Sequence, residues 1–392
     1  MPLPFGRVLR QPVLRRVLPA MLVSALGDGM SMVAVAWLAL TLAPPERAGV
    51  WTGLAVAAYT LPSTLGAAML GRPLGRLPGV RLVAIDASLR AVALGVIAVL
   101  GIAGVLDPAV YVALLAGSSL LHAWGQAGAY TLIAEALPEE DRVHGNALLS
   151  GFSQASFIVG PAIAGIMTTL TGPAWVIGAD AATFLLLASI GWSIRVPREV
   201  AGSEREPAPE YVMTSAWRVI LERRQLFGLI VVTCVFFFLY GPVEVALPVH
   251  VAQDVHGSSV LLGTFWTVFG VGAALGGLGA GLLRRLPLWA VVVGIIVGWG
   301  IALLPLGLTD SVTCPLVAFA FGGLIYGPFT AICMELVQRI SPPATLSRVL
   351  ATRAALTTPA NALGTLLGGP LVAAVGGRRA LFLSAVLTIA FG

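Results

Sequence analysis

Long apolar runs, separated by short polar segments, fill this sequence from about residue 17 to its end. A helix rises about 1.5 Å per residue, so roughly twenty apolar residues cross the hydrocarbon core of a bilayer. The pattern therefore predicts an all-α membrane protein. The expected spans are 17–42, 48–70, 81–104, 108–136, 145–170 and 174–194, then 225–249, 258–283, 287–308, 311–337, 347–375 and 379–392.

The expected spans form two sets of six that share short sequence features. Gly160-Pro161 returns as Gly369-Pro370, and Arg76-Leu77-Pro78 returns as Arg285-Leu286-Pro287, each pair being 209 positions apart. One shared offset in a chain about twice that long indicates two related halves. We expect an N-terminal half at 1–194, a linker loop at 195–224 and a C-terminal half at 225–392.

Arginines lie mostly in alternate loops, which orients the chain. With the N-terminus in the cytoplasm, cytoplasmic segments hold about eighteen arginines and outer segments only Arg47, Arg378 and Arg379. This asymmetry predicts that both termini and the 195–224 loop are cytoplasmic. The last span has only fourteen residues, so either the natural chain continues beyond Gly392 or this helix stops short.

Composition excludes a soluble enzyme. Only 10% of the residues are charged and 58% are hydrophobic, whereas soluble domains carry about 25% charged residues. The net charge of +5 does not indicate nucleic-acid binding, because the arginines occupy short loops between apolar runs. The sequence contains no phosphate-binding loop, nucleophile elbow or metal-ligand motif, so we expect no catalytic residue, metal or cofactor.

Polar side chains form one-sided stripes on three of the expected helices. Such stripes, at helical spacing, predict a central polar cavity. The alternative is hydrogen bonding between helices, which explains isolated Ser and Thr residues equally well. The stripes comprise Ser24, Asp28 and Ser31 on the first span, Ser119, His122, Gln126 and Tyr130 on the fourth, and Thr233, Phe237, Tyr240 and Glu244 on the seventh.

Ionisable residues at membrane depth are the candidates for coupling transport to protons. A carboxylate buried without a cation partner binds and releases protons readily, which makes Asp28 the first candidate carrier and Glu244 the second. Asp86 and Arg90 are four residues apart on the third span and are expected to pair in a structural or gating role, with direct contact to the substrate as the alternative. Asp180, near the outer end of the sixth span, is interpreted as a charge that faces water.

The paired six-helix pattern resembles the major facilitator superfamily. Within it, GPAIAG at 160–165 is similar to the fifth-helix motif of the drug–proton antiporters. GDGM at 27–30 and the run from Glu135 to Asn146 are similar to members of the macrolide-efflux and siderophore-exporter types. The resemblance covers nearly the whole chain and implies alternating access between two halves.

The resemblance also implies gating residues, and here the sequence departs from the usual pattern. The loop from Gly71 to Arg81 carries Gly75 where relatives carry an Asp, and Ala129 stands where many carry an Arg. The Gly-Pro pairs are expected to bend the fifth and eleventh spans and to give them smooth sliding faces. The expected gating residues are Arg72, Arg76, Arg81, Asp86, Arg90, Gly160, Pro161, Gly165, Gly369 and Pro370.

These observations favour a proton-coupled exporter of lipophilic or amphiphilic small molecules, working as a monomer in a bacterial inner membrane. The alternatives are an exporter or importer of a siderophore or metal, and a non-transporting receptor or lipid flippase. Flux coupled to protons would separate the exporter from a receptor. Stabilisation by a metal would indicate the siderophore or metal alternative.

Overall fold

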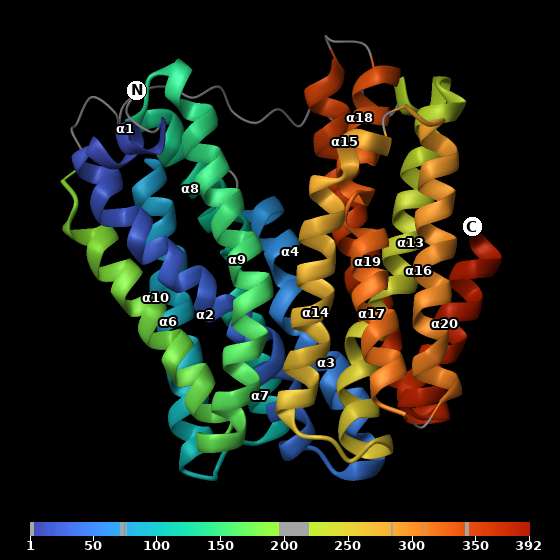
Figure 1. The fold of residues 1–392 in the computed structure, drawn as a ribbon. Helices are drawn as coiled ribbons and strands as arrows, with labels where there is room; N and C mark the ends of the chain where they lie inside the picture. Colours follow the sequence, from blue (N-terminus) through green and yellow to red (C-terminus); the bar gives the residue numbers. More distant parts are fainter. Residues whose placement is uncertain are drawn as a thin grey trace. The chain divides into compact units, whose positions relative to one another are not determined.

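The computed structural model describes residues 4–70, 74, 77–195, 219–283, 285–309, 311–341 and 345–392 (Figure 1). Nearly all of these residues are helical, and none of them forms a strand. Eight of the described helices are long and apolar enough to cross a membrane. The expected all-α membrane fold is confirmed.

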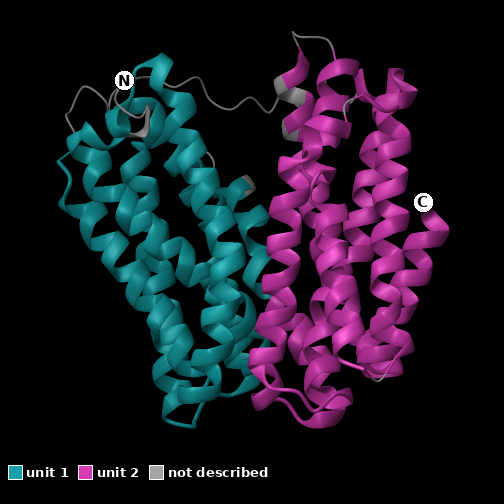
Figure 2. Ribbon diagram, in the orientation of Figure 1, with its two compact units in different colours: residues 1–38, 58–208 teal, residues 39–57, 209–392 magenta. Residues whose placement is uncertain are grey.

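The helices gather into two compact units (Figure 2). Unit 1 comprises the described residues of 1–38 and 58–208, and unit 2 those of 39–57 and 209–392. The expected boundary after residue 194 put residues 39–57 in the first half. The structure instead packs this segment with unit 2, because glycines on it fit closely against a helix near the C-terminus.

Unit 1 contains eight helices in its described part. They are α1 (Pro4–Arg10), most of α2 (Pro12–Leu42), α4 (Pro62–Met69), α6 (Gly79–Ile102), α7 (Pro108–Ser119), α8 (His122–Ala136), α9 (Glu139–Thr171) and α10 (Pro173–Ser193). Two expected spans are divided, one between α3 and α4 before Pro62, the other between α7 and α8 at Leu120 and Leu121. Helices therefore cover the residues of these expected spans, while their interruptions were not foreseen.

Unit 2 is made of two parts of the chain, residues 39–57 and the described residues of 209–392. Its elements are η1 (Pro45–Arg47), most of α3 (Ala48–Thr60), α13 (Arg224–Val249), η2 (His250–Asp254), α14 (Ser259–Leu278), α15 (Ala280–Leu283), α16 (Leu288–Leu308), α17 (Thr313–Tyr326), α18 (Phe329–Ile340), α19 (Leu346–Val375) and α20 (Gly377–Phe391). The break between α14 and α15 falls at Gly279, and that between α17 and α18 at Gly327 and Pro328.

A glycine with positive φ follows both the fifth and the eleventh expected span. Gly172 lies between α9 and α10 with φ +93°, and Gly376 lies between α19 and α20 with φ +86°. Backbone at these angles strains any residue with a side chain. In each unit a glycine with positive φ therefore links two consecutive helices. The two glycines follow the fifth and the eleventh expected spans, as the internal repeat in the sequence predicts.

Glycines bring the backbones of α2 and α9 together in unit 1. A Cβ placed on Gly160 would lie 2.5–2.6 Å from the C and Cα atoms of Gly29, and Ser156 donates a hydrogen bond to the carbonyl of Ala25. Pro161 and Gly165 are buried on the same helix, which continues through the proline. The expected smooth face of the fifth span is present, and its neighbour in unit 1 is α2.

The second Gly-Pro pair joins α19 to the early segment of unit 2. A Cβ on Gly53 would lie 2.8 Å from the Cα of Gly369, and one on Gly49 would lie 2.8 Å from the side chain of Val372. Pro370 is exposed. This contact between small residues explains why 39–57 belongs to unit 2.

Aromatic side chains fill the centre of unit 2. Trp299 is fully buried, and its ring lies 5.3 Å from that of Phe269, 5.7 Å from Tyr240 and 5.9 Å from Tyr326 between ring centroids. Such tilted and edge-to-face pairs add to the stabilisation from burial alone. The aromatic cluster comprises Phe236, Phe237, Tyr240, Phe265, Trp266, Phe269, Trp299, Phe319, Tyr326 and Phe329.

Candidate functional site

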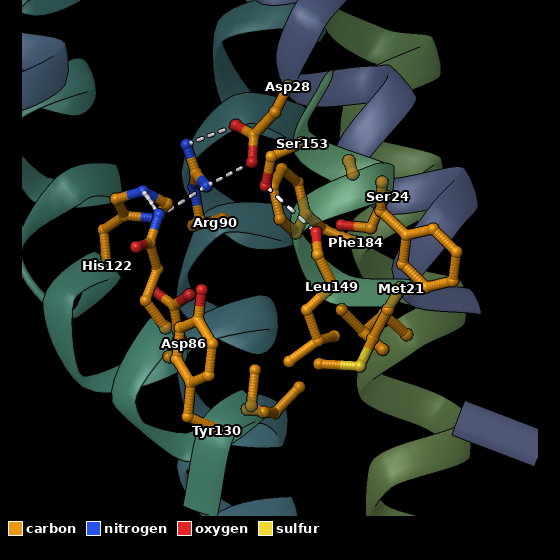
Figure 3. Close-up of a pocket in the computed structure, with 17 residues that line it drawn as sticks. Met21, Ser24, Asp28, Asp86, Arg90, His122, Tyr130, Leu149, Ser153 and Phe184 are labelled. Atoms are coloured by element: carbon orange, nitrogen blue, oxygen red, sulfur yellow. Dashed lines mark hydrogen bonds and ion pairs between the residues drawn. The ribbon is translucent and has the colours of Figure 1, made fainter. Parts of the chain in front are cut away.

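Unit 1 contains an open cavity of about 160 Å³ among its helices (Figure 3). Of the predicted cavity residues, Ser24, His122, Gln126 and Tyr130 line it. Its wall also contains three charged groups, those of Asp28, Asp86 and Arg90, together with apolar side chains. The apolar part is formed by Met21, Val83, Leu149, Phe152, Phe184 and Leu187.

Asp28 and Arg90 form an ion pair at this cavity. One guanidinium nitrogen of Arg90 lies 2.8 Å from Asp28 Oδ1 and the other donates to Oδ2 at 3.0 Å. Arg90 is 1% exposed, while the side chain of Asp28 keeps 30% of its exposure. The prediction that Asp28 lacks a cation partner is therefore wrong, because Arg90 of α6 reaches across to α2.

The expected pairing of Asp86 with Arg90 is also wrong. No hydrogen bond or ion pair joins the two side chains, although both are described. Arg90 is committed to Asp28, to the Tyr59 hydroxyl at 2.7 Å and to His122 Nδ1 at 3.0 Å. Asp86 is 7% exposed, and its buried Oδ1 has no hydrogen-bond partner.

Tyr59 ties the ion pair to α3. Its hydroxyl donates to Asp28 Oδ1 at 2.7 Å and accepts from Arg90, and the guanidinium lies 5.2 Å from the centre of its ring. The ring of Phe184 covers the guanidinium at 4.4 Å. Neither aromatic residue was a sequence candidate, since a lone Tyr or Phe in an apolar span gives no signal of such a contact.

His122 and Gln126 extend the network from α8. Arginine has only donors, so Nδ1 of His122 accepts from Arg90 and the proton of the neutral ring lies on Nε2. The Gln126 amide lies 3.1 Å from that Nε2 and must present its oxygen there. The arrangement keeps His122 neutral as long as Arg90 points at it.

Asp180 was interpreted as a charge that faces water, and this is wrong. It is fully buried, and the hydroxyls of Ser31 and Thr183 donate to its carboxylate. Gly27 on α2 leaves room for it, because a Cβ there would collide with the carboxylate. Ser31, a predicted cavity residue, is used in this buried contact and does not line the cavity.

The predicted site residues of the seventh span belong to unit 2. Phe237 and Tyr240 pack in the aromatic cluster and do not line the described cavity. Glu244 is partly buried and accepts a hydrogen bond from the Thr365 hydroxyl at 2.9 Å, which ties α13 to α19.

Among the expected gating arginines, Arg81 has a clear structural contact. Its guanidinium donates to the carbonyl oxygens of Gly191, Trp192 and Ile194, and it lies 5.0 Å from the centre of the Trp192 ring. It therefore satisfies carbonyls at the C-terminal end of α10, where a cation is favoured. Arg72 and Arg76 lie outside the described residues.

The described part of the chain contains no cluster of side chains suited to binding a metal ion. No group of three or more His, Cys, Asp or Glu side chains there could hold a metal ion. A cavity with charged side chains on its wall, among membrane-spanning helices, is the kind of site that a multi-pass transporter uses.

The family model of the Major Facilitator Superfamily matches residues 17–358, so the chain belongs to this superfamily. It is similar to the multidrug efflux pump Tap of Mycobacterium tuberculosis, with 29% identity over 389 residues, covering 95% of this chain and 90% of that protein. Tap of Mycolicibacterium fortuitum is 27% identical over 374 residues, covering 92% and 89%.

Solved structures share the fold at low identity. A bacterial homologue of the lysosomal transporter Spinster has a TM-score of 0.70 at 15% identity, covering 97% of this chain and 94% of that one. A bacterial homologue of the iron transporter ferroportin has a TM-score of 0.68 at 17% identity, covering 98% and 99%. The protein is thus a transporter of the multi-pass membrane class and not an enzyme.

Proposed function

We propose that this protein exports lipophilic or amphiphilic small molecules from the bacterial cytoplasm in exchange for protons, by alternating access. Two similar proteins are multidrug efflux pumps, and their similarity extends over almost the whole chain. The observation that carries the proposal is the Asp28–Arg90 ion pair at a cavity whose wall combines polar and apolar side chains.

A proton arriving at Asp28 would remove one charge of this pair. Arg90 would then lose its strongest attraction, and the hydrogen bond from Tyr59 would weaken with it. Because Tyr59 lies near the C-terminal end of α3, the change would act on a helix whose earlier residues pack in unit 2. In this proposal Asp28 carries the proton and Glu244 is a second site.

Asp28→Asn tests the proton role. Asparagine keeps the shape and some of the hydrogen bonding but cannot release a proton. We expect purified protein in vesicles with a pH gradient to stop concentrating ethidium, while ethidium binding measured by fluorescence persists. Asp107→Asn is the matched control, because Asp107 caps α7 through the amides of Ala109 and Val110 and Asn caps a helix equally well. Uphill transport by Asp28→Asn at the wild-type rate would refute the assignment.

The proposed orientation places both termini in the cytoplasm of a bacterium with the chain in its inner membrane. A reporter that is active only outside the cytoplasm should therefore give a signal when inserted at Asp107, between α6 and α7, and none at Pro138, between α8 and α9. The reverse result would invert the topology.

Siderophore or metal transport is the alternative within the same fold. Among the solved structures with this fold is a bacterial metal transporter, with a TM-score of 0.65 at 17% identity. At that identity the likeness concerns the fold alone. We favour export of organic molecules, because apolar side chains such as Met21, Leu149 and Phe152 form much of the cavity wall beside its charged groups.

A further inference from the structure

Arg90 ties its own helix, α6, to three other helices of the chain. Its two terminal nitrogens contact Asp28 of α2 at 2.8 and 3.0 Å, the Tyr59 hydroxyl of α3 at 2.7 Å and His122 Nδ1 of α8 at 3.0 Å. The remaining nitrogen of the guanidinium, Nε, is buried and has no hydrogen-bond partner in the described part of the chain. One N–H donor of Arg90 is therefore unused in this conformation.

A matching acceptor lies one turn away on the same helix. Asp86 precedes Arg90 by four residues, so the two side chains leave the same face of α6 (Figure 3). Asp86 is 7% exposed and Arg90 1%. The buried Oδ1 of Asp86 has no hydrogen-bond partner among the described residues. A buried donor and a buried acceptor without partners, one turn apart, indicate a pairing that this conformation does not use.

The titratable side chains on α10 and α7, two helices that pack against α6, have other partners. Asp180 of α10 accepts hydrogen bonds from the hydroxyls of Ser31 and Thr183. Tyr111 of α7 donates to the carbonyl of Val35 at 2.9 Å. Neither group therefore competes with Asp86 as the unused acceptor on α6.

The third helix packed against α6 is α8, and its titratable groups do not take the place of Asp86 either. His122 accepts from Arg90, as described above. Tyr130 lines the cavity, and a tyrosine hydroxyl is neutral at physiological pH. Glu135 accepts from the amide of Gly79 at 3.1 Å, at the start of α6 and two turns before Asp86.

The position of Asp86 is fixed by close packing of α8. A Cβ on Gly125 would lie 2.6 Å from Cγ and 2.8 Å from Cβ of Asp86, so this position of α8 requires glycine. A Cβ on Gly128, one turn further on, would lie 2.6 Å from the Cβ of Leu82. Asp86 is therefore held in place, whereas the long side chain of Arg90 can move its charge by changing rotamers while α6 stays where it is.

We propose that Arg90 alternates between two carboxylates, Asp28 in the conformation seen here and Asp86 after a proton has bound to Asp28. The inference rests on the proposed proton-coupled export and adds Asp86 to it as the second carboxylate of the coupling step. An ionised carboxylate buried without a cation is costly, so the carboxylate that Arg90 leaves holds a proton.

The protons balance in this exchange. Asp28 takes up one proton, Arg90 moves to Asp86, and Asp86 releases one proton to water in the cavity. Before and after the exchange, one carboxylate is ionised beside the guanidinium and the other is protonated, so the net charge of the three groups stays the same. The return of Arg90 to Asp28 reverses both proton transfers.

The exchange replaces contacts between helices by a contact within one helix. While Arg90 is bound to Asp28, it connects α6 to α2, α3 and α8. Bound to Asp86, it satisfies a neighbour on α6 itself and releases those three helices. A proton on Asp28 thereby becomes a freedom of α2 and α3 to move relative to α6.

A double-variant cycle on the purified full-length protein tests the shared partner. Asp28→Asn imitates the protonated Asp28 and leaves Asp86 for Arg90, whereas Asp28→Asn with Asp86→Asn leaves neither. Residues that share a partner couple by up to about a hundredfold in an equilibrium constant. We therefore expect the double variant to lower the folding equilibrium constant, measured by chemical unfolding in detergent, at least about tenfold more than the product of the two single effects.

Asp180→Asn is the matched comparison for Asp86→Asn in this cycle, because it removes another buried carboxylate near Arg90. Combined with Asp28→Asn, it should give the product of the single effects within about twofold. The same product rule for Asp28→Asn with Asp86→Asn would overturn the proposal. Coupling of Asp28 to Asp180 in place of Asp86 would overturn the assignment to Asp86.

Infrared spectroscopy locates the proton and needs no substitution at Asp86. The C=O stretch of a protonated carboxyl group is distinct from that of a carboxylate. At neutral pH we expect Asp28→Asn to lose one protonated-carboxyl signal of the wild type, because Arg90 moves to Asp86 and displaces its proton. Asp86→Asn should lose the same signal, and Asp180→Asn should keep it. An unchanged signal in Asp28→Asn would overturn the proposal, and a purely structural Asp86 would give that result.

The exchange of partners and the export function can fail separately, because neither measurement depends on transport. A protein that shows the coupling and the infrared change but never concentrates ethidium would contradict the export function while supporting the exchange. A protein that exports ethidium against a gradient but shows neither effect would contradict the exchange alone.

Discussion

The two units are built on related helix patterns but have centres of different chemistry. Unit 1 surrounds Arg90 with three carboxylates, a histidine and a tyrosine. Unit 2 has aromatic rings at its centre, and its Glu244 accepts a hydrogen bond from Thr365. Buried charges are costly unless they are paired, whereas packed aromatic rings stabilise by burial and by ring–ring contacts. The Asp28–Arg90 ion pair and its hydrogen-bond partners therefore belong to unit 1.

Removing the cation should cause the largest effect and tests whether unit 1 depends on its charges. In Arg90→Met, Asp28 loses its ion-pair partner, and breaking a buried ion pair costs about 3–5 kcal/mol. Because Asp28 retains some exposure, we expect the lower end of that range and a complete loss of uphill transport. Thermal unfolding in detergent measures the stability.

A rescue variant separates charge from packing in this experiment. Arg90→Met combined with Asp28→Asn removes both members of the ion pair, so part of the lost stability should return. An unchanged melting temperature in Arg90→Met, or no recovery in the double variant, would show that the ion pair does not organise unit 1.

Substitutions at the glycines of the two Gly-Pro pairs should change stability by an intermediate amount, and they compare the helix contacts of the two units. In Gly160→Ala the new methyl group meets backbone atoms of Gly29 at about 2.5 Å, so we expect a loss of about 1–3 kcal/mol. In Gly369→Ala the nearest atom, the Gly49 carbonyl oxygen, lies at 3.1 Å, and the loss should be smaller. Chemical unfolding of the two variants ranks the contacts.

Gly151→Ala is the control on the same helix as Gly160. Nothing lies within 4 Å of a Cβ at Gly151, so alanine should stabilise the helix by about 0.5–1 kcal/mol. If Gly160→Ala were as stable as this control, the close approach of α2 and α9 would not be a constraint.

Glu244→Gln should have the smallest effect and tests whether the carboxylate of unit 2 acts like that of unit 1. Glutamine can still accept from Thr365, so we expect a stability change below about 1 kcal/mol. Uphill ethidium transport should slow without stopping, because Asp28 remains. If Glu244→Gln abolished uphill ethidium transport while Asp28→Asn transported normally, Glu244 would be the main proton carrier in place of Asp28.

The helices and their polar faces could be predicted from the sequence, because both are local. The apolar runs placed the spans, and helical spacing brought Ser24, His122, Gln126 and Tyr130 to the cavity wall. The Gly-Pro pairs also marked close helix contacts correctly. These features depend on residues within a few turns of one another or on the presence of glycine itself.

The pairing of the charges could not be predicted, because it depends on which helices are neighbours. Arg90 has an acidic residue four positions before it, yet it pairs with Asp28, 62 positions away. Asp180 lies near a predicted outer end but faces Gly27 and Ser31 of α2. In both cases the prediction used only spacing along one helix. The observed partner lies on another helix, and the sequence pattern does not tell which helices are neighbours.

The contact of α3 with α19 also has a consequence for how the protein is made. Gly53 and Gly369 are 316 positions apart, and synthesis proceeds at about 5–20 residues per second. The ribosome therefore needs roughly 15–60 s to deliver the partner of α3 after α3 itself has emerged. During that time the glycine face of α3 must be covered by lipid or by the insertion machinery. Unit 2 therefore begins with one of the first helices made and can close only after one of the last.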